Sequence, residues 1–184
     1  MCPPVGLEVK LDPNRPRRIE LYGRIDAVVQ KGGTVVLARR ARGEAKWRDR
    51  QQLHGFLNLV VLSAAGLLCT QKQHVYLLNA GPPAKSEVQP FQPFSQQESR
   101  AYLASLLTDM LSGVHDYFLP FEVASLFYKN QKQIPLHVCM EQVRQSGRSM
   151  YGPVPQPEKY PFPSEAKAMI ERRYGLFFSK RLEK

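Results

Sequence analysis

A period-two alternation of apolar and polar residues begins at Ile19 and constrains the fold more than any other feature of the chain. Apolar or small side chains recur at every second position as far as Val29, which predicts a half-buried strand. The tripeptide Lys31-Gly32-Gly33 is typical of a tight turn, and residues 34–40 after it have the composition of a second strand. Residues 19–40 therefore predict a β-hairpin.

A long helix is predicted after this hairpin. Its apolar face has the spacing i, i+3, i+4, i+7, i+8, i+11 and consists of Leu53, Phe56, Leu57, Val60, Val61 and Ala64. Gly66 is the expected C-terminal stop. The apolar stretch 56–69 is too short to span a bilayer, so we expect a buried helix. With a short strand at 75–78, this order predicts an α/β fold with a mixed β-sheet flanked by α-helices.

The second half of the chain is predicted to be mainly helical. Ser95 and Glu98 have the spacing of a capping box and predict a helix over 96–111. Further helices are expected over 120–129 and 136–145, and after Ser164. We expect the remaining organisation to be an N-terminal arm at 1–18, a single domain at 19–184, and proline-rich loops at 81–94 and 151–163.

The charge balance favours a polyanionic partner. The chain has 26 Lys and Arg against 16 Asp and Glu, a net charge of +10. Nucleic acid is the natural partner of such an excess, and no basic amphipathic helix suggests an anionic membrane instead. The three isolated cysteines, Cys2, Cys69 and Cys139, argue against a disulfide framework and suit a reducing cytosol, so a cytoplasmic location is expected.

A dense basic cluster lies between the predicted strand and the predicted helix. Its members are Arg39, Arg40, Arg42, Lys46, Arg48 and Arg50, opposed by Glu44 and Asp49. Guanidinium forks suit phosphate oxygens, and the amides of a helix N-terminus add to them. The cluster therefore predicts nucleic-acid contact, while the alternative is a solvated loop of mixed charge. Trp47, within the cluster, is a candidate for stacking on a base or on a partner protein.

The hairpin also carries the spacing of a nuclease motif. Gly23-Arg24-Ile25-Asp26, then a strand that closes near Gly43, resembles the core of the PD-(D/E)XK nuclease superfamily, in particular the nuclease domains of RecB-type helicases. Asp26 matches the first aspartate of that pattern, but Arg39 stands at the second aspartate and Ala41 at the lysine. Gln52 matches the glutamine of the following helix, with Phe56 in place of its tyrosine. The resemblance implies a restriction-endonuclease-like fold in which Asp26 and Gln52 are vestigial.

A divalent cation needs several oxygen ligands, and the positive charge of an arginine beside Asp26 would repel the cation. We therefore expect no catalytic residues, no metal and no cofactor. A Gly-x-x-x-x-Gly-Lys-Ser/Thr loop is also missing from the sequence, so ATP hydrolysis is not expected of this chain.

Three further segments of the sequence are similar to one branch of this superfamily. Residues 47–57, 113–121 and 170–175 resemble the C-terminal domain of the exodeoxyribonuclease V gamma subunit (RecC) family. That resemblance implies a non-catalytic domain that binds DNA and other subunits within an ATP-dependent helicase–nuclease. It also implies RecB-like and RecD-like partners, a role in double-strand break processing and recombinational repair, and a chain that is a fragment of a longer subunit.

Two other functions remain open. One is an active metal-dependent nuclease whose ligands have migrated, for instance to Glu20, Asp26 and Glu44. The other is a basic protein-interaction domain that has no DNA contact and meets an acidic partner instead.

Overall fold

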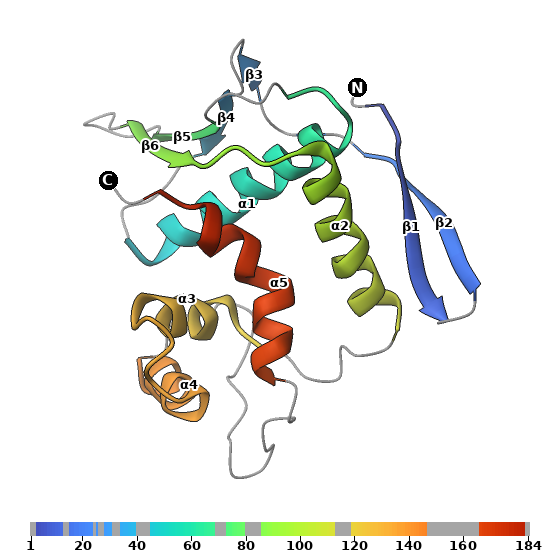
Figure 1. Ribbon diagram of the computed structural model, residues 1–184. Coiled ribbons are helices and arrows are strands. Elements are labelled where there is room, and N and C mark those ends of the chain that lie inside the picture. Colours follow the sequence, from blue (N-terminus) through green and yellow to red (C-terminus); the bar gives the residue numbers. More distant parts are fainter. Residues whose placement is uncertain are drawn as a thin grey trace.

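The computed structural model describes residues 3–12, 15–23, 25, 28–30, 34–39, 45–68, 73–79, 86–112, 119–146 and 166–182. Figure 1 shows the strands and helices in chain order. The strands are β1 (Val5–Asp12), β2 (Arg15–Leu21), β3 (Val28–Gln30), β4 (Thr34–Arg39), β5 (Gln73–Asn79) and β6 (Ser86–Phe91). The helices are α1 (Ala45–Ala64), α2 (Gln96–Leu111), α3 (Phe121–Lys129), α4 (Leu136–Gln145) and α5 (Ala166–Lys180).

The fold is of the mixed α/β class. Strands β3, β4, β5 and β6 form one sheet in that order, in which β4 and β5 run parallel and the other neighbours run antiparallel. Helix α1 makes the connection between the two parallel strands, as a parallel pair requires. Strands β1 and β2 form a separate antiparallel ribbon, which lies alongside α2 in Figure 1.

Several local predictions are confirmed. Strands β3 and β4 pair antiparallel as predicted, with Gln30 in register with Thr34, while the predicted turn at 31–33 lies outside the described residues. Helix α1 ends where Gly66 was expected to stop it, because Gly66 takes the left-handed conformation (φ +74°) in which its amide and that of Leu67 cap the last carbonyls. The Ser95–Glu98 capping box is formed at the start of α2. Among the described residues, no helix is both long and apolar enough to cross a membrane.

The N-terminal arm predicted at 1–18 is corrected by the structure. Residues 5–12 and 15–21 are strands, and the strand β2 continues across the expected boundary at position 18. The arm orders because Val5, Leu7 and Val9 are buried in the main core. The alternation over 19–29 is also not one strand, since β2 ends at Leu21 and β3 begins at Val28.

The loop predicted at 81–94 is also partly wrong, because residues 86–91 form β6. Pro90 lacks the N–H of a regular strand residue, and such a residue is tolerated near a sheet edge. Residues 181 and 182, after α5, pair with this strand through their backbone. The Leu182 amide donates to the Pro90 carbonyl at 3.1 Å, and Arg181 forms an isolated antiparallel β-bridge with Phe91. The other predicted loop, 151–163, lies outside the described residues.

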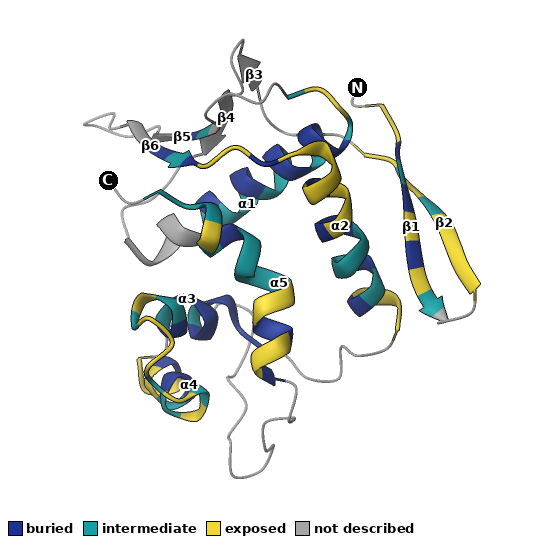
Figure 2. Cartoon of the chain, in the orientation of Figure 1, coloured by how far each residue is buried: buried dark blue, intermediate teal, exposed yellow. Residues whose placement is uncertain are grey.

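The core has two parts that share helix α5. The larger part centres on Phe56, whose ring lies 5.1 Å from that of Phe91 and 5.5 Å from that of Phe177 between centroids. The smaller part joins α3, α4 and the first turns of α5 through residues such as Met140 and Ile170. Figure 2 shows buried positions along α1 and α5, the two helices that cross the middle of the molecule.

The first prediction concerns this aromatic centre. Replacing Phe56 with Ala is expected to lower the free energy of unfolding by about 3–5 kcal/mol, since Phe56 is fully buried and the ring leaves a cavity. Urea titration followed by circular dichroism measures the decrease. Met110→Ala is the control, because Met110 is 56% exposed and its change should stay within about 0.5 kcal/mol. Equal decreases in the two variants would contradict this account of the core.

The second prediction concerns pH. The ammonium of Lys180 at 2.8 Å lowers the pKa of Glu98, whose carboxylate also accepts the Ser95 amide. Because the pKa is lower in the folded protein, the stabilisation is present above the unfolded pKa and is lost as pH falls through the folded value. Glu98→Gln keeps a capping side chain but cannot titrate. The free energy of unfolding of the Glu98→Gln variant should therefore change less between about pH 5 and pH 3 than the free energy of unfolding of the unsubstituted protein.

Candidate nucleic-acid interface

The predicted basic cluster follows the carboxyl end of β4. Arg39 is the last residue of this strand and is in register with Asn79, the last residue of the parallel strand β5. Helix α1 begins at Ala45, so Lys46 and Arg48 belong to its first turn. The expected passage from a strand end to a helix start is confirmed. In open α/β sheets, ligands bind outside the carboxyl ends of parallel strands.

Only part of this cluster is described at side-chain level. Arg40 and Arg42 lie outside the described residues, as do Asp26 and Glu44. For Arg39, Lys46, Trp47 and Arg48 the structure gives the backbone element alone. Their roles in binding phosphate or stacking on a base therefore stay predictions.

Arg50 has an interior position. Its guanidinium forms an ion pair with Glu122 at the start of α3, and the two side chains are only 12% and 15% exposed. The pair joins α1 to α3, and breaking it would leave a poorly hydrated charge. We therefore assign Arg50 a structural role and do not include it among the arginines that reach a phosphate.

A pocket of about 270 Å³ opens beside this ion pair. Its wall is formed by Arg50, Leu53, His54, Leu57, Leu119, Phe121 and Tyr174. The hydroxyl of Tyr174 donates to the Leu119 carbonyl at 3.3 Å, and burial raises the pKa of this tyrosine. Glu122 pairs with Arg50 and the tyrosine hydroxyl is already bonded, so the pocket offers mainly apolar surface, with His54 as its remaining polar side chain.

Gln52 lies one turn before Phe56 on α1 and is only 3% exposed. Its side-chain oxygen accepts no hydrogen bond from any residue in the described part of the chain. A buried amide oxygen usually has a hydrogen-bond donor, and the described residues do not supply one for Gln52. Its assignment as a vestigial site residue remains a prediction, since the side chains around β4 are not described.

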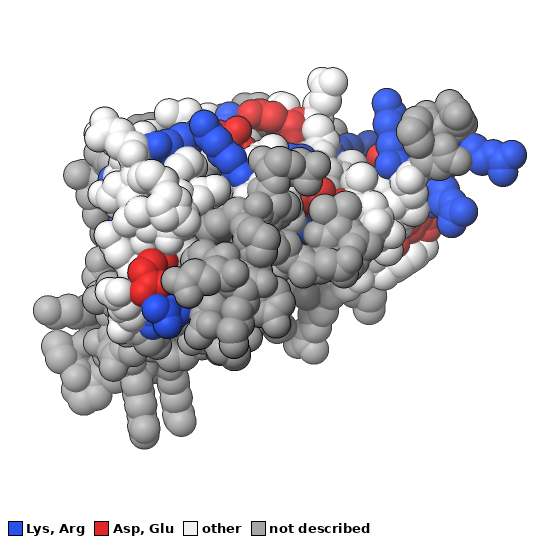
Figure 3. Space-filling view, turned by 90° about the horizontal axis from the view of Figure 1, so that it is seen from below, with Lys and Arg blue, Asp and Glu red and all other residues white. Residues whose placement is uncertain are grey.

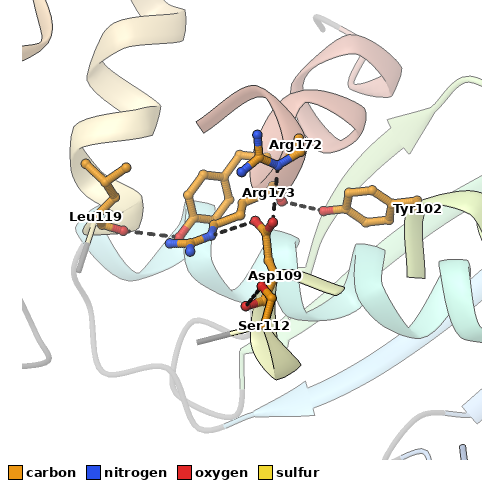
Figure 4. Close-up of polar contacts among 7 residues, drawn as sticks. Tyr102, Asp109, Ser112, Leu119, Arg172 and Arg173 are labelled. Atoms are coloured by element: carbon orange, nitrogen blue, oxygen red, sulfur yellow. Dashed lines mark hydrogen bonds and ion pairs between the residues drawn. The ribbon is translucent and has the colours of Figure 1, made fainter. Parts of the chain in front are cut away.

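A second ionic cluster, which sequence reasoning missed, ties α5 to α2. Figure 4 shows the carboxylate of Asp109 between two arginines, with Arg172 Nε at 3.2 Å and Arg173 Nε at 3.3 Å. The hydroxyl of Tyr102 donates to the carbonyl of Arg173, and burial raises the pKa of Tyr102. No local sequence pattern predicts this cluster, because Asp109 and the two arginines are more than 60 residues apart in the chain.

The β1–β2 ribbon presents a further basic surface, also missed. Arg15, Arg17 and Arg18 on β2 and Lys10 on β1 are all exposed. The signal was present in the sequence, because Val5, Leu7, Val9 and Leu11 alternate as the residues of a half-buried strand do. Glu20, one of the alternative metal ligands, lies on this ribbon and accepts a hydrogen bond from Tyr22. Within the described ranges, no three His, Cys, Asp or Glu side chains gather as a metal site would need.

The third prediction tests the interior ion pair. Glu122→Gln should lower the free energy of unfolding by about 3 kcal/mol, because it removes the carboxylate that faces the poorly exposed Arg50 guanidinium. The double variant Arg50→Met with Glu122→Leu should recover most of that stability, since apolar side chains of similar size remove both charges. Urea titration of the two variants measures the difference. A double variant less stable than Glu122→Gln would show that the pair itself is stabilising.

Comparison with known proteins identifies no relative of this chain. No protein-family model matches it, and neither a curated protein nor a solved structure gives a significant match. The α/β class therefore rests on the strand order, and any function has to be argued from the positions of the residues themselves.

Proposed function

We propose that this chain is a non-catalytic DNA-binding domain with a degenerate nuclease fold, similar to the C-terminal domain of the exodeoxyribonuclease V gamma subunit family. The observation that carries the proposal is the position of Arg39-Arg40-Ala41-Arg42, which follows the carboxyl end of β4 in the parallel β4–β5 pair. A working nuclease of this type needs acidic ligands there, and the present sequence offers phosphate-binding groups instead.

The strand order supports a nuclease-like core. An antiparallel hairpin (β3–β4), a crossover helix (α1) and a parallel strand (β5) follow one another in the order that the motif spacing predicts. The next strand, β6, adds antiparallel to β5. The helix that carries Gln52 is the crossover helix, as the resemblance to RecB-type nuclease domains requires.

The composition of the first turn of α1 supports an anionic ligand. This turn holds Lys46 and Arg48 and no acidic residue, and Glu44 and Asp49 adjoin it in the sequence. The N-terminus of a helix carries a partial positive charge, so acidic residues are favourable there and basic residues are not. A phosphate at this end would relieve the repulsion and accept hydrogen bonds from the first amides.

The alternative of migrated metal ligands gains little support. Glu20 belongs to the β1–β2 ribbon, whereas β3 and β4, which flank the motif, belong to the other sheet. Its carboxylate already has Tyr22 and Arg18 as neighbours. We therefore favour DNA binding over DNA cleavage. The further step, to a helicase–nuclease with RecB-like and RecD-like partners that acts in recombinational repair, rests on the resemblance in the sequence.

The fourth prediction tests the proposed surface. In the variant Arg39→Gln/Arg40→Gln/Arg42→Gln, the slope of log affinity against log salt should fall by about 0.9 for each duplex phosphate that the chain no longer neutralises. Fluorescence anisotropy with a labelled duplex at several salt concentrations gives this slope. Lys129→Gln/Arg144→Gln/Lys167→Gln is the matched control, because it removes the same charge from exposed positions on α3, α4 and α5 and should leave the slope unchanged.

The competing functions give different results in the same assay. A cluster variant that binds with the slope of the original chain would contradict the assignment of this surface. No binding of the original chain to DNA at low salt would favour a protein partner. Cleavage of the labelled DNA in Mg²⁺ or Mn²⁺, abolished by Asp26→Asn, would show an active nuclease instead.

A further inference from the structure

One face of strand β2 changes from apolar to basic along its length. Leu21 and Ile19 pair with Val5 and Leu7, and these side chains pack in the main core. Every second residue of a strand lies on the same face, so the next positions on this face are Arg17 and then Arg15. Both arginines are exposed. The ribbon is therefore anchored at its apolar end and carries its arginines toward the opposite end, where β1 ends and β2 begins (Figure 1).

Four basic side chains, Lys10, Arg15, Arg17 and Arg18, lie toward this end, and Asp12, whose side chain is not described, is in register with Arg15. Arg15 and Arg17 form no ion pair with any described carboxylate. Arg18 lies 3.7 Å from Glu20, but the two side chains are 77% and 43% exposed, and such a surface pair is weak. Figure 3 shows Lys and Arg side chains fanning out from the end of the molecule that holds the ribbon, with Asp or Glu side chains beside them.

The open edge of β2 is unsuited to pairing with another strand. Pro16 lacks an amide donor, and charged side chains flank it on both sides. Proline and charge on an edge strand are features that prevent strand addition. The partner that fits this edge is therefore one that binds the side chains rather than the backbone.

We propose that the end of the β1–β2 ribbon is a second DNA-binding surface that contacts the phosphate backbone through Arg15 and Arg17, while Lys10 and Arg18 on the other face of the ribbon add positive charge. The proposal rests on the proposed function for the identity of the polyanion. Arg15 and Arg17 are two residues apart, about 6.6–6.8 Å along a strand, so both guanidinium groups can bind one phosphate strand. A two-stranded ribbon also has the dimensions to enter a major groove about 12 Å wide.

The two surfaces belong to different parts of the fold. The ribbon is a separate sheet beside α2, whereas the arginines of the other cluster follow β4 in the four-stranded sheet. Neutralising one surface therefore leaves the elements of the other intact. Contributions from well-separated sites add, so each surface should have its own share of the salt dependence.

The fifth prediction uses Arg15→Gln/Arg17→Gln/Arg18→Gln in the 184-residue chain. We expect binding to a labelled duplex to weaken at least about tenfold and the salt slope to fall by about 0.9 for each phosphate that is no longer bound. Arg15→Lys/Arg17→Lys/Arg18→Lys keeps the charge and should retain most of the slope. The triple variant on α3, α4 and α5 described above is again the charge-matched control. Urea unfolding of each variant confirms that it is folded.

Each outcome separates the two proposals. If the ribbon variant binds like the control while the Arg39/Arg40/Arg42 variant binds more weakly, the ribbon proposal is overturned and the proposed function stands. If only the ribbon variant binds more weakly, the ribbon is the binding surface and the β4–α1 assignment is wrong. Absence of any binding at low salt overturns both. Should the triple ribbon variant fail to fold, Arg17→Gln alone must lower the slope by about 0.9, and an unchanged slope overturns the ribbon proposal.

Discussion

The packing of aromatic rings around Phe56 holds the separate parts of this protein together. Phe56 on α1 meets Phe91 of β6, Phe94 just after that strand, and Phe177 of α5. Edge-to-face and tilted ring pairs of this kind add to the free energy already gained by burying the rings. Helix α5 then enters the smaller core through Met169 and Ile170. The sheet and the α3–α4 helices are therefore connected mainly through a few rings and one helix.

Helix α1 links this core to the proposed DNA-binding surface. Its C-terminal end is firmly held, because the Ala64 carbonyl accepts hydrogen bonds from Gln96 Nε2 and Arg100 Nε, both at 3.1 Å. Its middle is buried around Phe56, and its first turn follows the arginine-rich segment. Helix α1 is therefore fixed along most of its length, and residues on a rigid element are positioned more precisely than residues on a loop.

The arginines of this chain have two kinds of position. Arg50, Arg100 and Arg173 are used within the fold, as partners of carboxylates or of helix-end carbonyls. Arg15 and Arg17 project from the ribbon without a described carboxylate. Net charge alone does not separate the two kinds, since both count equally toward +10. The structure thus reduces the set of basic residues that are candidates for binding a polyanion. A guanidinium that is already paired in the interior does not reach a phosphate.

The sequence by itself determined the elements that depend on neighbours along the chain. The spacing of apolar residues predicted α1, and the bounds of α4 were predicted as observed. The capping box and Gly66 were also predicted correctly, because a cap is made by residues a few positions apart.

Only the tertiary structure decided which surfaces cover one another. Strand β6 was missed because Pro90 argues against a strand unless its place near a sheet edge is known. The ribbon was taken for an arm because its pattern is short, and α2, which covers it, lies far along the chain. Likewise Arg50 was placed in the phosphate-binding cluster because its partner, Glu122, is 72 positions away. Pairing between distant residues depends on how the chain folds back on itself, and that information is not carried by any local pattern.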